Sequence, residues 1–302
     1  MSDRLALVTG GMGFVGRHVI SALILAGYRV IGVGHGVNNV PINGFRWIEG
    51  DVDLETLKNI KEVPEIVIHC AGGGSVAFAN SNPFEDFSRT VDTTLAVLEY
   101  ARQCSSIPRV VLPSSAAVYG GAKSWPTPEA ELAAPVSPYG IHKYMAEKIC
   151  QSYAKYYSIP VAIVRLFSVY GVGLRKQLLW DACCKFSEGT ASFFGCGNEE
   201  RDWIHISDAV SLLLHVASFA GEHCPIYNGG SGSAVSNREL LSFLSGYFDN
   251  SSELCFSGVV KVGDPDRYHA DIRAAKDIGW SPRVTWEEGV AGYAEWFKKG
   301  AV

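Results

Sequence analysis

The stretch LALVTGGMGFVG, residues 5–16, decides the fold class of this chain. Five strand-forming residues run into a glycine-rich turn with glycines at 10, 11, 13 and 16, and a helical pattern begins directly after them. Glycine is needed in such a turn because the turn is tight, the backbone must approach a phosphate, and the helix must pack closely on the strand. A phosphate then lies on the N-terminus of the helix. The stretch therefore predicts a dinucleotide cradle at the start of a βαβ unit.

Short β-branched runs alternate with longer helical patterns over the following 150 residues. We expect strands at 5–9, 29–33, 45–49, 65–69, 109–113 and 161–166, and helices near 15–26, 54–60, 84–104 and 138–157. This alternation is typical of a doubly wound parallel sheet. The predicted fold class is α/β: a Rossmann doubly wound parallel sheet with a smaller mixed α/β substrate lobe.

The regular alternation ends after Arg165, where glycines, aromatic residues and short mixed segments follow. Further helices are expected near 208–219, 237–247 and 286–299. A chain of 302 residues exceeds what one hydrophobic core usually serves, so we expect two lobes. The dinucleotide-binding Rossmann domain is predicted to comprise residues 1–166 and 203–228, and the second lobe residues 167–202 and 229–302.

Composition and charge exclude several classes of protein. Hydrophobic residues make up 47% of the chain and charged residues 19%, which is the balance of a globular protein. The net charge is −5 and the basic residues are scattered, so we expect no nucleic-acid partner. No run approaches 18 apolar residues and no signal-peptide pattern opens the chain, which predicts a cytoplasmic protein without a membrane partner. None of the eight cysteines form a C-x-x-C pair, so no metal site is expected.

The end of the second predicted strand bears on the choice of cofactor. An NAD-selective cradle usually places Asp or Glu there, where it accepts hydrogen bonds from the adenosine ribose. This chain has Gly34 and His35 instead, and no acidic residue occurs between Gly16 and Glu49. The missing carboxylate favours NADP(H), with NAD(H) as the alternative. In a second interpretation Gly34 merely leaves room, and either cofactor fits.

The segment SPYGIHK, residues 137–143, opens a predicted helix with Ser137 as N-cap and Pro138 in the first turn. Tyr139 and Lys143 are then one turn apart on the same face. A lysine ammonium beside a tyrosine favours the phenolate, and moving a pKa from about 10 toward 7 takes about 4 kcal/mol. We therefore predict an acid/base pair, with Lys143 and an oxidised nicotinamide supplying the positive charge.

The strand at 109–113 runs into SSAAVYG, residues 114–120, which places a hydroxyl where α/β proteins bind ligands. The motifs T-G-x-x-G-x-x-G, S-S-x-x-V-Y-G and Y-x-x-x-K together resemble the extended short-chain dehydrogenase/reductase family, in its branch of nucleotide-sugar epimerases, dehydratases and reductases. HCAG at 69–72, RLFSVYG at 165–171 and RDWIHISD at 201–208 are similar to further segments of that family. The resemblance extends over nearly the whole chain.

The resemblance implies roles for individual residues and makes the second lobe the nucleotide-sugar-binding lobe. Tyr139 would be the general acid/base at the reacting sugar oxygen, Ser115 would hydrogen-bond that oxygen, and Lys143 would hold the nicotinamide ribose. The implied cofactor contacts are Thr9, Gly10, Gly11, Met12, Gly13, Phe14, Val15, Gly16, Gly34, His35, Asp51, Val52, Cys70, Ala71, Gly72, Tyr139 and Lys143. The implied substrate contacts are Gly74, Ser75, Ser115, Ser168, Gln177, Phe194, Arg201 and Lys261. Among these, Arg201 would grip the diphosphate, while the neighbouring Asp202 and Asp208 are expected to be structural.

Departures from the family pattern narrow the reaction. The family's 4,6-dehydratases follow the catalytic hydroxyl with an Asp-Glu pair, and this chain has Ala116 and Ala117, whose methyl groups cannot transfer protons. A dehydratase is therefore not expected. We expect an NADPH-dependent reductase of a nucleotide-linked 4-keto-6-deoxy sugar. The alternative is a nucleotide-sugar 4-epimerase, like UDP-glucose 4-epimerase, with retained NAD, and the third interpretation is a non-catalytic NADP-sensing regulator. We also expect a homodimer.

Overall fold

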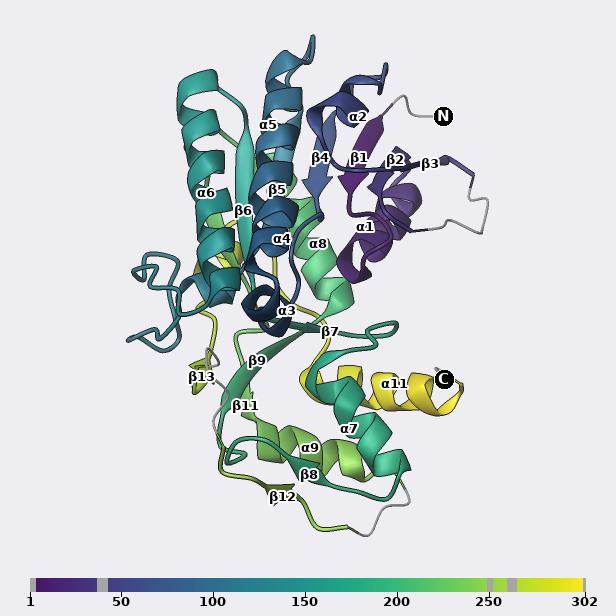
Figure 1. Ribbon diagram of the computed structural model, residues 1–302, viewed down its shortest axis with the longest axis vertical. Coiled ribbons are helices and arrows are strands. Elements are labelled where there is room, and N and C mark those ends of the chain that lie inside the picture. Colours follow the sequence, from purple (N-terminus) through teal and green to yellow (C-terminus); the bar gives the residue numbers. More distant parts are fainter. Residues whose placement is uncertain (1–3, 37–42, 249–251, 260–264, 301–302) are drawn as a thin grey trace. The chain divides into compact units, whose positions relative to one another are not determined.

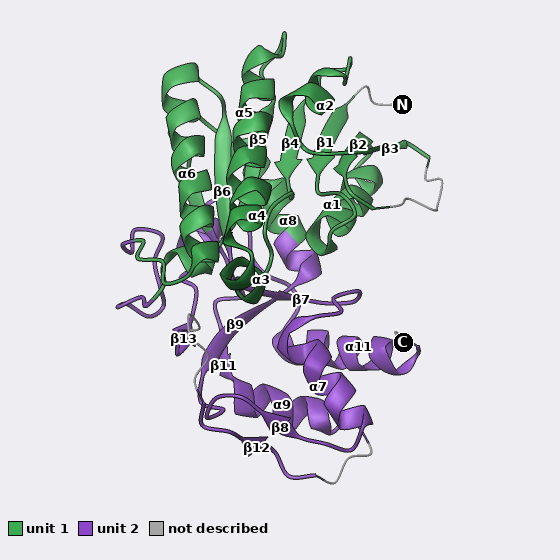
Figure 2. Ribbon diagram, viewed as in Figure 1, with its two compact units in different colours: residues 1–120, 133–165, 210–227 green, residues 121–132, 166–209, 228–302 purple. Residues whose placement is uncertain are grey.

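The computed structural model describes residues 4–36, 43–248, 252–259 and 265–300 (Figure 1). The chain divides into two compact units (Figure 2). Unit 1 comprises residues 1–120, 133–165 and 210–227, and unit 2 comprises residues 121–132, 166–209 and 228–302. No helix among the described residues is both long enough and apolar enough to cross a membrane.

The largest sheet has seven strands in the order β10-β6-β5-β4-β1-β2-β3. They are β1 (Leu5–Thr9), β2 (Arg29–Gly34), β3 (Phe45–Glu49), β4 (Ile66–His69), β5 (Arg109–Ser115), β6 (Val161–Leu166) and β10 (Ile226–Gly229). The pairs β1–β2, β2–β3, β1–β4 and β4–β5 are all parallel. The predicted Rossmann sheet is thus confirmed. Because the strand order reverses between β1 and β4, the switch point where such folds bind ligands lies at the ends of these two strands.

Helices of unit 1 connect the strands. They are α1 (Phe14–Leu25), α2 (Leu54–Lys58), α3 (Val76–Ser81), α4 (Pro83–Phe87), α5 (Thr93–Gln103) and α6 (Pro138–Tyr157), while α8 (Ile206–Val216) begins in unit 2 and ends in unit 1. Figure 1 shows α5 and α6 side by side along the sheet, where they contact each other. Their buried faces pack Leu98, Ala146 and Cys150 into the core formed by the strand residues.

The single helix expected at 84–104 is wrong in one respect, because a π-helical segment, Ser88–Asp92, separates α4 from α5. Two threonine side chains act there: Oγ1 of Thr93 donates to the carbonyl of Arg89, and Oγ1 of Thr94 donates to the carbonyl of Thr90, both at 2.6 Å. Such hydroxyls compete with the helical hydrogen bonds and alter the local winding.

Unit 2 is a mixed α/β lobe, as predicted. A four-stranded sheet contains β11 (Ala234–Ser236), β9 (Glu200–His205) and β13 (Arg267–Tyr268) in that order, with β7 (Ser168–Tyr170) also paired to β9. β8 (Ser192–Phe193) pairs with β12 (Cys255–Phe256), and the helices are α7 (Gln177–Ser187), α9 (Asn237–Ser245), α10 (Arg273–Asp277) and α11 (Trp286–Lys298).

Two buried aspartates hold loops of unit 2 together. The Asp202 carboxylate accepts hydrogen bonds from the backbone N–H groups of Ser231, Gly232 and Ala270. Asp208 accepts from the backbone N–H groups of Arg283 and Val284 at 3.0 and 2.9 Å. Both therefore have structural roles.

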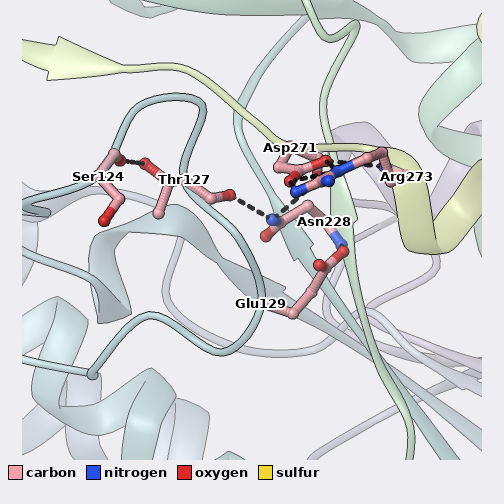
Figure 3. Close-up of polar contacts among 6 residues, drawn as sticks. All are labelled: Ser124, Thr127, Glu129, Asn228, Asp271 and Arg273. Atoms are coloured by element: carbon pink, nitrogen blue, oxygen red, sulfur yellow. Dashed lines mark hydrogen bonds and ion pairs between the residues drawn. The ribbon is translucent and has the colours of Figure 1, made fainter.

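The segment 121–132 belongs to unit 2 because it is bonded to Asn228, which has no exposed surface (Figure 3). The Asn228 side-chain amide donates to the carbonyls of Thr127 and Asp271, at 2.8 and 3.1 Å. Its backbone N–H donates to the Glu129 carboxylate at 2.8 Å. One buried amide thus joins three separate stretches of chain.

Candidate active site

The turn after β1 has the geometry that its glycines predict. Gly10 has φ +65°, and a β-carbon on it would lie 2.6 Å from the backbone nitrogen of Ala71. A β-carbon on Gly16 would lie 2.2 Å from the carbonyl oxygen of Gly10. Side chains are excluded at both positions because the neighbouring atoms belong to the backbone. The turn therefore lies tightly between the ends of β1 and β4.

The N-terminus of α1 presents backbone donors to an anion. Gly13 is the N-cap, no side chain caps the helix, and its first turn contains no acidic residue. Unpaired N–H groups and the helix dipole together favour a phosphate at such a position. Gly11, Met12, Phe14 and Val15 complete this turn. These features fit the pyrophosphate of a dinucleotide.

The end of β2 differs from what the sequence suggested. Gly34 has φ +149° and leaves room beside Gly10, whose Cα would lie 3.4 Å from a β-carbon on Gly34. His35 is paired, because its Nε2 lies 2.9 Å from Oδ1 of Asp51, which follows β3. This carboxylate lies beyond the interval between Gly16 and Glu49, and Asp51 is one of the cofactor contacts that the family resemblance implied. Val52, its neighbour, packs against the core of unit 1.

A buried chain of polar groups fixes the end of β4. The ring of His69 lies 2.7 Å from the Thr9 hydroxyl through Nδ1 and 3.1 Å from the Thr94 hydroxyl through Nε2. Burial and, to a smaller extent, the charge of Lys143 lower the pKa of His69 to about 3, so that the ring is neutral. Burial also raises the pKa of the Cys70 thiol to about 12. The segment Cys70–Gly72 is thus held beside the cradle by neutral groups.

The three predicted catalytic residues come together from β5 and α6. Ser137 caps α6 by accepting from the backbone N–H of Gly140 at 3.2 Å, as predicted. Tyr139, in the first turn of α6, lies near Ser115 at the end of β5, close enough for the Ser115 side chain to lower its pKa. Nζ of Lys143 donates to the carbonyl of Pro113 at 3.3 Å and lies 5.9 Å from the centroid of the Tyr139 ring.

Burial and neighbouring side chains decide the protonation of this group. Burial raises the pKa of Tyr139, its hydrogen bond to Ser115 lowers it, and the charge of Asp86 raises it. Burial lowers the pKa of Lys143, whereas the charge of Asp86 raises it. The pKa of Tyr139 is therefore raised in the chain by itself, and the lowering expected from Lys143 together with an oxidised nicotinamide stays a prediction.

Two residues beside this group were missed by the sequence argument. His142 and Asp86 are both buried, and Nδ1 of His142 lies 2.7 Å from Oδ2 of Asp86. His142 could have been noticed, since it stands in SPYGIHK three residues after Tyr139 and next to Lys143. Asp86 carries no local signal, because only the packing of α4 against α6 brings it there.

Apart from Ser115, the predicted substrate residues of unit 1 occupy the loop after β4. Gly74 is exposed, and Ser75 caps α3, since its hydroxyl accepts from the backbone N–H of Phe78 at 3.3 Å. Thr90 lies behind this loop, where its hydroxyl accepts from the backbone N–H of Gly73 at 2.9 Å.

The other predicted substrate residues belong to unit 2, apart from Lys261, which lies outside the described residues. Arg201 is buried in β9, where Nη1 donates to the carbonyls of Glu200 and Asp266 at 2.8 and 3.3 Å. Ser168 in β7 is paired in register with Trp203. Gln177 opens α7 with φ +68° and is exposed, as is Phe194.

Fold and site together define a Rossmann protein with a dinucleotide cradle and a helical Tyr-Lys pair. Residues 6–230 match the model of the NAD dependent epimerase/dehydratase family, and the chain belongs to that family.

Similar proteins cover the chain almost completely. The UDP-glucose 4-epimerase of Mycolicibacterium smegmatis is 28% identical over 97% of this chain and 98% of its own length. Among solved structures, UDP-glucose 4-epimerase of Thermotoga maritima with UDP-glucose is 28% identical, with a TM-score of 0.88 over 98% of this chain and 99% of its own. UDP-glucuronic acid 4-epimerase from Bacillus cereus, in complex with UDP-glucuronic acid and NAD, is 25% identical, with a TM-score of 0.83 over the same shares.

Proposed function

We propose that this protein is a nucleotide-sugar 4-epimerase that acts on a UDP-linked hexose and retains its NAD. The observation that carries the proposal is the cluster of Ser115, Tyr139 and Lys143 next to the glycine cradle. It provides a proton-transferring phenol close to the predicted position of a nicotinamide. The likeness to 4-epimerases over the whole chain favours this activity over the reduction of a 4-keto-6-deoxy sugar, which the sequence placed first.

The proposed chemistry assigns one task to each residue. A bound nicotinamide cofactor supplies a reversible hydride acceptor. The phenolate of Tyr139 takes the proton of the sugar 4-hydroxyl as that carbon becomes a ketone, and the phenol later returns a proton to the ketone oxygen. Ser115 hydrogen-bonds the same oxygen, and the Lys143 ammonium stabilises the phenolate. The overall reaction inverts C4 without net oxidation.

The choice of NAD over NADP rests on the end of β2. Nε2 of His35 lies 2.9 Å from the Asp51 carboxylate, so a 2′-phosphate at the imidazole would also meet a carboxylate. The carboxylate also adds negative charge there, which disfavours a phosphate. Gly34 leaves room for the ribose without contributing a charge. These contacts support NAD, whereas the sequence alone favoured NADP(H).

The two positions that follow Ser115 carry no side chain that could transfer a proton in the elimination of water. Ala116 and Ala117 follow it and are both buried, with 2% and 9% of their surface exposed. A 4,6-dehydratase would need an acid and a base near these positions, so we propose no dehydratase activity. The sugar nucleotide is proposed to bind the unit 2 residues Ser168, Gln177, Phe194 and Arg201, and the homodimer and the cytoplasmic location remain predictions.

The test is to incubate the purified protein with UDP-glucose, UDP-galactose and their C6-oxidised and N-acetylated relatives, without added cofactor, and to separate the products. Interconversion of C4 epimers is expected, with NAD released when the protein is denatured. Tyr139→Phe should retain the NAD and lose at least about 100-fold in turnover, the typical worth of a positioned acid/base. If the wild type instead consumes NADPH with a 4-keto sugar and interconverts no epimers, the protein is a reductase.

A further inference from the structure

Asp86 is a buried carboxylate that the proposed chemistry does not yet use. It stands on α4 without exposed surface, and its Oδ2 is held by Nδ1 of His142 on α6 at 2.7 Å. Its Oδ1 is also buried and has no hydrogen-bond partner. A half-satisfied buried carboxylate is unfavourable unless positive charge nearby offsets it. We therefore expect a positively charged group near the Asp86 carboxylate.

The loop after β4 brings that cation close. A β-carbon on Gly73 would lie only 1.9 Å from Oδ1 of Asp86, so this glycine makes room for the carboxylate. A β-carbon on the preceding Gly72 would lie 3.2 Å from Nζ of Lys143. The hydroxyl of Thr90 would lie 3.2 Å from the first of these positions and 3.7 Å from the second. Two adjacent glycines and one hydroxyl thus separate the carboxylate from the ammonium.

Other titratable groups around Lys143 act on its pKa less than Asp86 does. Glu147, one turn further along α6, is bonded to Arg165 of β6. Glu85 and Arg89, near Asp86 in the chain, pair with each other at the surface. From β4, His69 is neutral and Cys70 remains a thiol, and α3 has no titratable side chain. Asp86 is accordingly the strongest anionic influence on Lys143, and its charge raises the pKa of Lys143 against the effect of burial.

We propose that the Asp86–His142 pair is the counter-charge of the buried Lys143 ammonium and a positioning element for proton transfer at Tyr139. His142 holds the carboxylate in place, and Asp86 keeps the ammonium charged next to the phenol. Neither residue touches the reacting atoms, so both act through Lys143 and Tyr139. The kinetic part of this inference rests on the proposed epimerase function.

The sign of the effect follows from the charge. A carboxylate stabilises a nearby ammonium and destabilises a nearby phenolate, so it raises the pKa of Lys143 and the pKa of Tyr139. The active form has the phenolate and the ammonium together. In a profile of kcat/KM against pH, the acid limb reports deprotonation of Tyr139 and the alkaline limb deprotonation of Lys143. Removing the charge of Asp86 must therefore shift both limbs to lower pH.

The experiment measures this profile for Asp86→Asn, which keeps the shape of the side chain. Both limbs are expected to move down by roughly 0.5–1 pH unit, less than the 1–3 units of a direct ion pair because Asp86 touches neither group. A second neutral variant, Asp86→Ser, should shift them in the same direction. Glu85→Gln removes an exposed carboxylate from the same helix and should leave both limbs unmoved. His142→Leu should lower kcat, and His142→Asn, whose amide can still donate to Asp86, should recover most of it.

A second readout needs no substrate. The ultraviolet absorbance of tyrosinate is titrated with NAD bound, and subtracting the same protein carrying Tyr139→Phe isolates this one phenol. Asp86→Asn should lower the midpoint of this titration. An unchanged midpoint with lower turnover would make Asp86 a structural residue and overturn the inference. A lowered midpoint in a protein that epimerises no sugar would retain the counter-charge and refute the proposed function alone.

Discussion

The buried ion pair between Glu147 and Arg165 gives a sharp prediction on stability. The guanidinium donates twice to the carboxylate, from Nε to Oε1 at 3.0 Å and from Nη2 to Oε2 at 2.8 Å. The Ser114 hydroxyl donates to Oε1 at 2.6 Å. The side chain of Arg165 is 5% exposed and that of Glu147 is 1% exposed. Burial lowers the pKa of Arg165, but the hydrogen bonds and charge of Glu147 raise it by more, so Arg165 stays charged.

Glu147→Gln keeps the shape of the side chain and removes its charge. Arg165 then remains buried without a counter-ion, and breaking such a pair costs about 3–5 kcal/mol. The free energy of unfolding of natural domains is about 5–15 kcal/mol, so this cost is a large fraction of the total stability. The free energy of unfolding is measured by urea denaturation, which is monitored by circular dichroism and by tryptophan fluorescence. The dependence of this free energy on urea concentration is compared between the variants.

The double variant Glu147→Met, Arg165→Met is the matched control. Because two apolar side chains leave no uncompensated charge, it should be more stable than either single variant, as replaced buried ion pairs often are. Two results would refute the reasoning. Glu147→Gln could lie within about 1 kcal/mol of wild type, or the double variant could lose as much as the sum of the two single variants, which would mean that the residues are not coupled.

The remaining predictions concern the ends of β1 and β4. The pKa of His69 is about 3 in the fold against about 6.5 for an unperturbed histidine, so its contribution to stability is complete above pH 6.5 and is lost as the pH falls toward 3. For each pH unit in that window, the free energy of unfolding should fall by about 1.4 kcal/mol more in the wild type than in His69→Asn. Denaturation at several pH values measures this difference. If the free energy of unfolding fell equally with pH in both proteins, the buried ring would not be neutral. Gly10→Ala should abolish NAD binding in a calorimetric titration, because its β-carbon would lie 2.6 Å from a backbone nitrogen. Gly27→Ala has φ +84° but no atom within 4 Å, so it should cost only about 1–2 kcal/mol and leave NAD binding intact.

The sequence predicted those parts of the fold that depend on local pattern. Strand runs, the glycine turn and the start of α6 follow from residue type and spacing, and all six predicted strands appear. Ser115 and Tyr139 could be assigned to one site from the sequence, because the motifs S-S-x-x-V-Y-G and Y-x-x-x-K occur together in the family that the chain resembles. Segment 121–132 has no such pattern. Its place in unit 2 depends on Asn228, about a hundred residues away in the chain.

The electrostatics of the site could not be predicted for the same reason. Spacing put Lys143 one turn from Tyr139, but the pKa of each group is decided by burial and by a carboxylate from α4. The pairing of His35 with Asp51 likewise joins the ends of two strands. Charges contributed by other elements are invisible to a search along one segment. Proton affinities and the charges near the end of β2 therefore could not be predicted from one segment.

Gly72 and Gly73, two of the three glycines after β4, show how geometry and charge are connected at this site. A β-carbon on Gly72 would meet the Lys143 ammonium and one on Gly73 would meet the Asp86 carboxylate, so this part of the loop lies beside both charged groups. Direct contact between the two groups would form an ion pair, and the ammonium of Lys143 would then bind Asp86 instead of a phenolate. Wide separation would leave the buried ammonium without support, and burial would favour its neutral form. In our proposal the charge of Asp86 keeps Lys143 charged without a direct ion pair, so that the ammonium stays available to a phenolate at Tyr139.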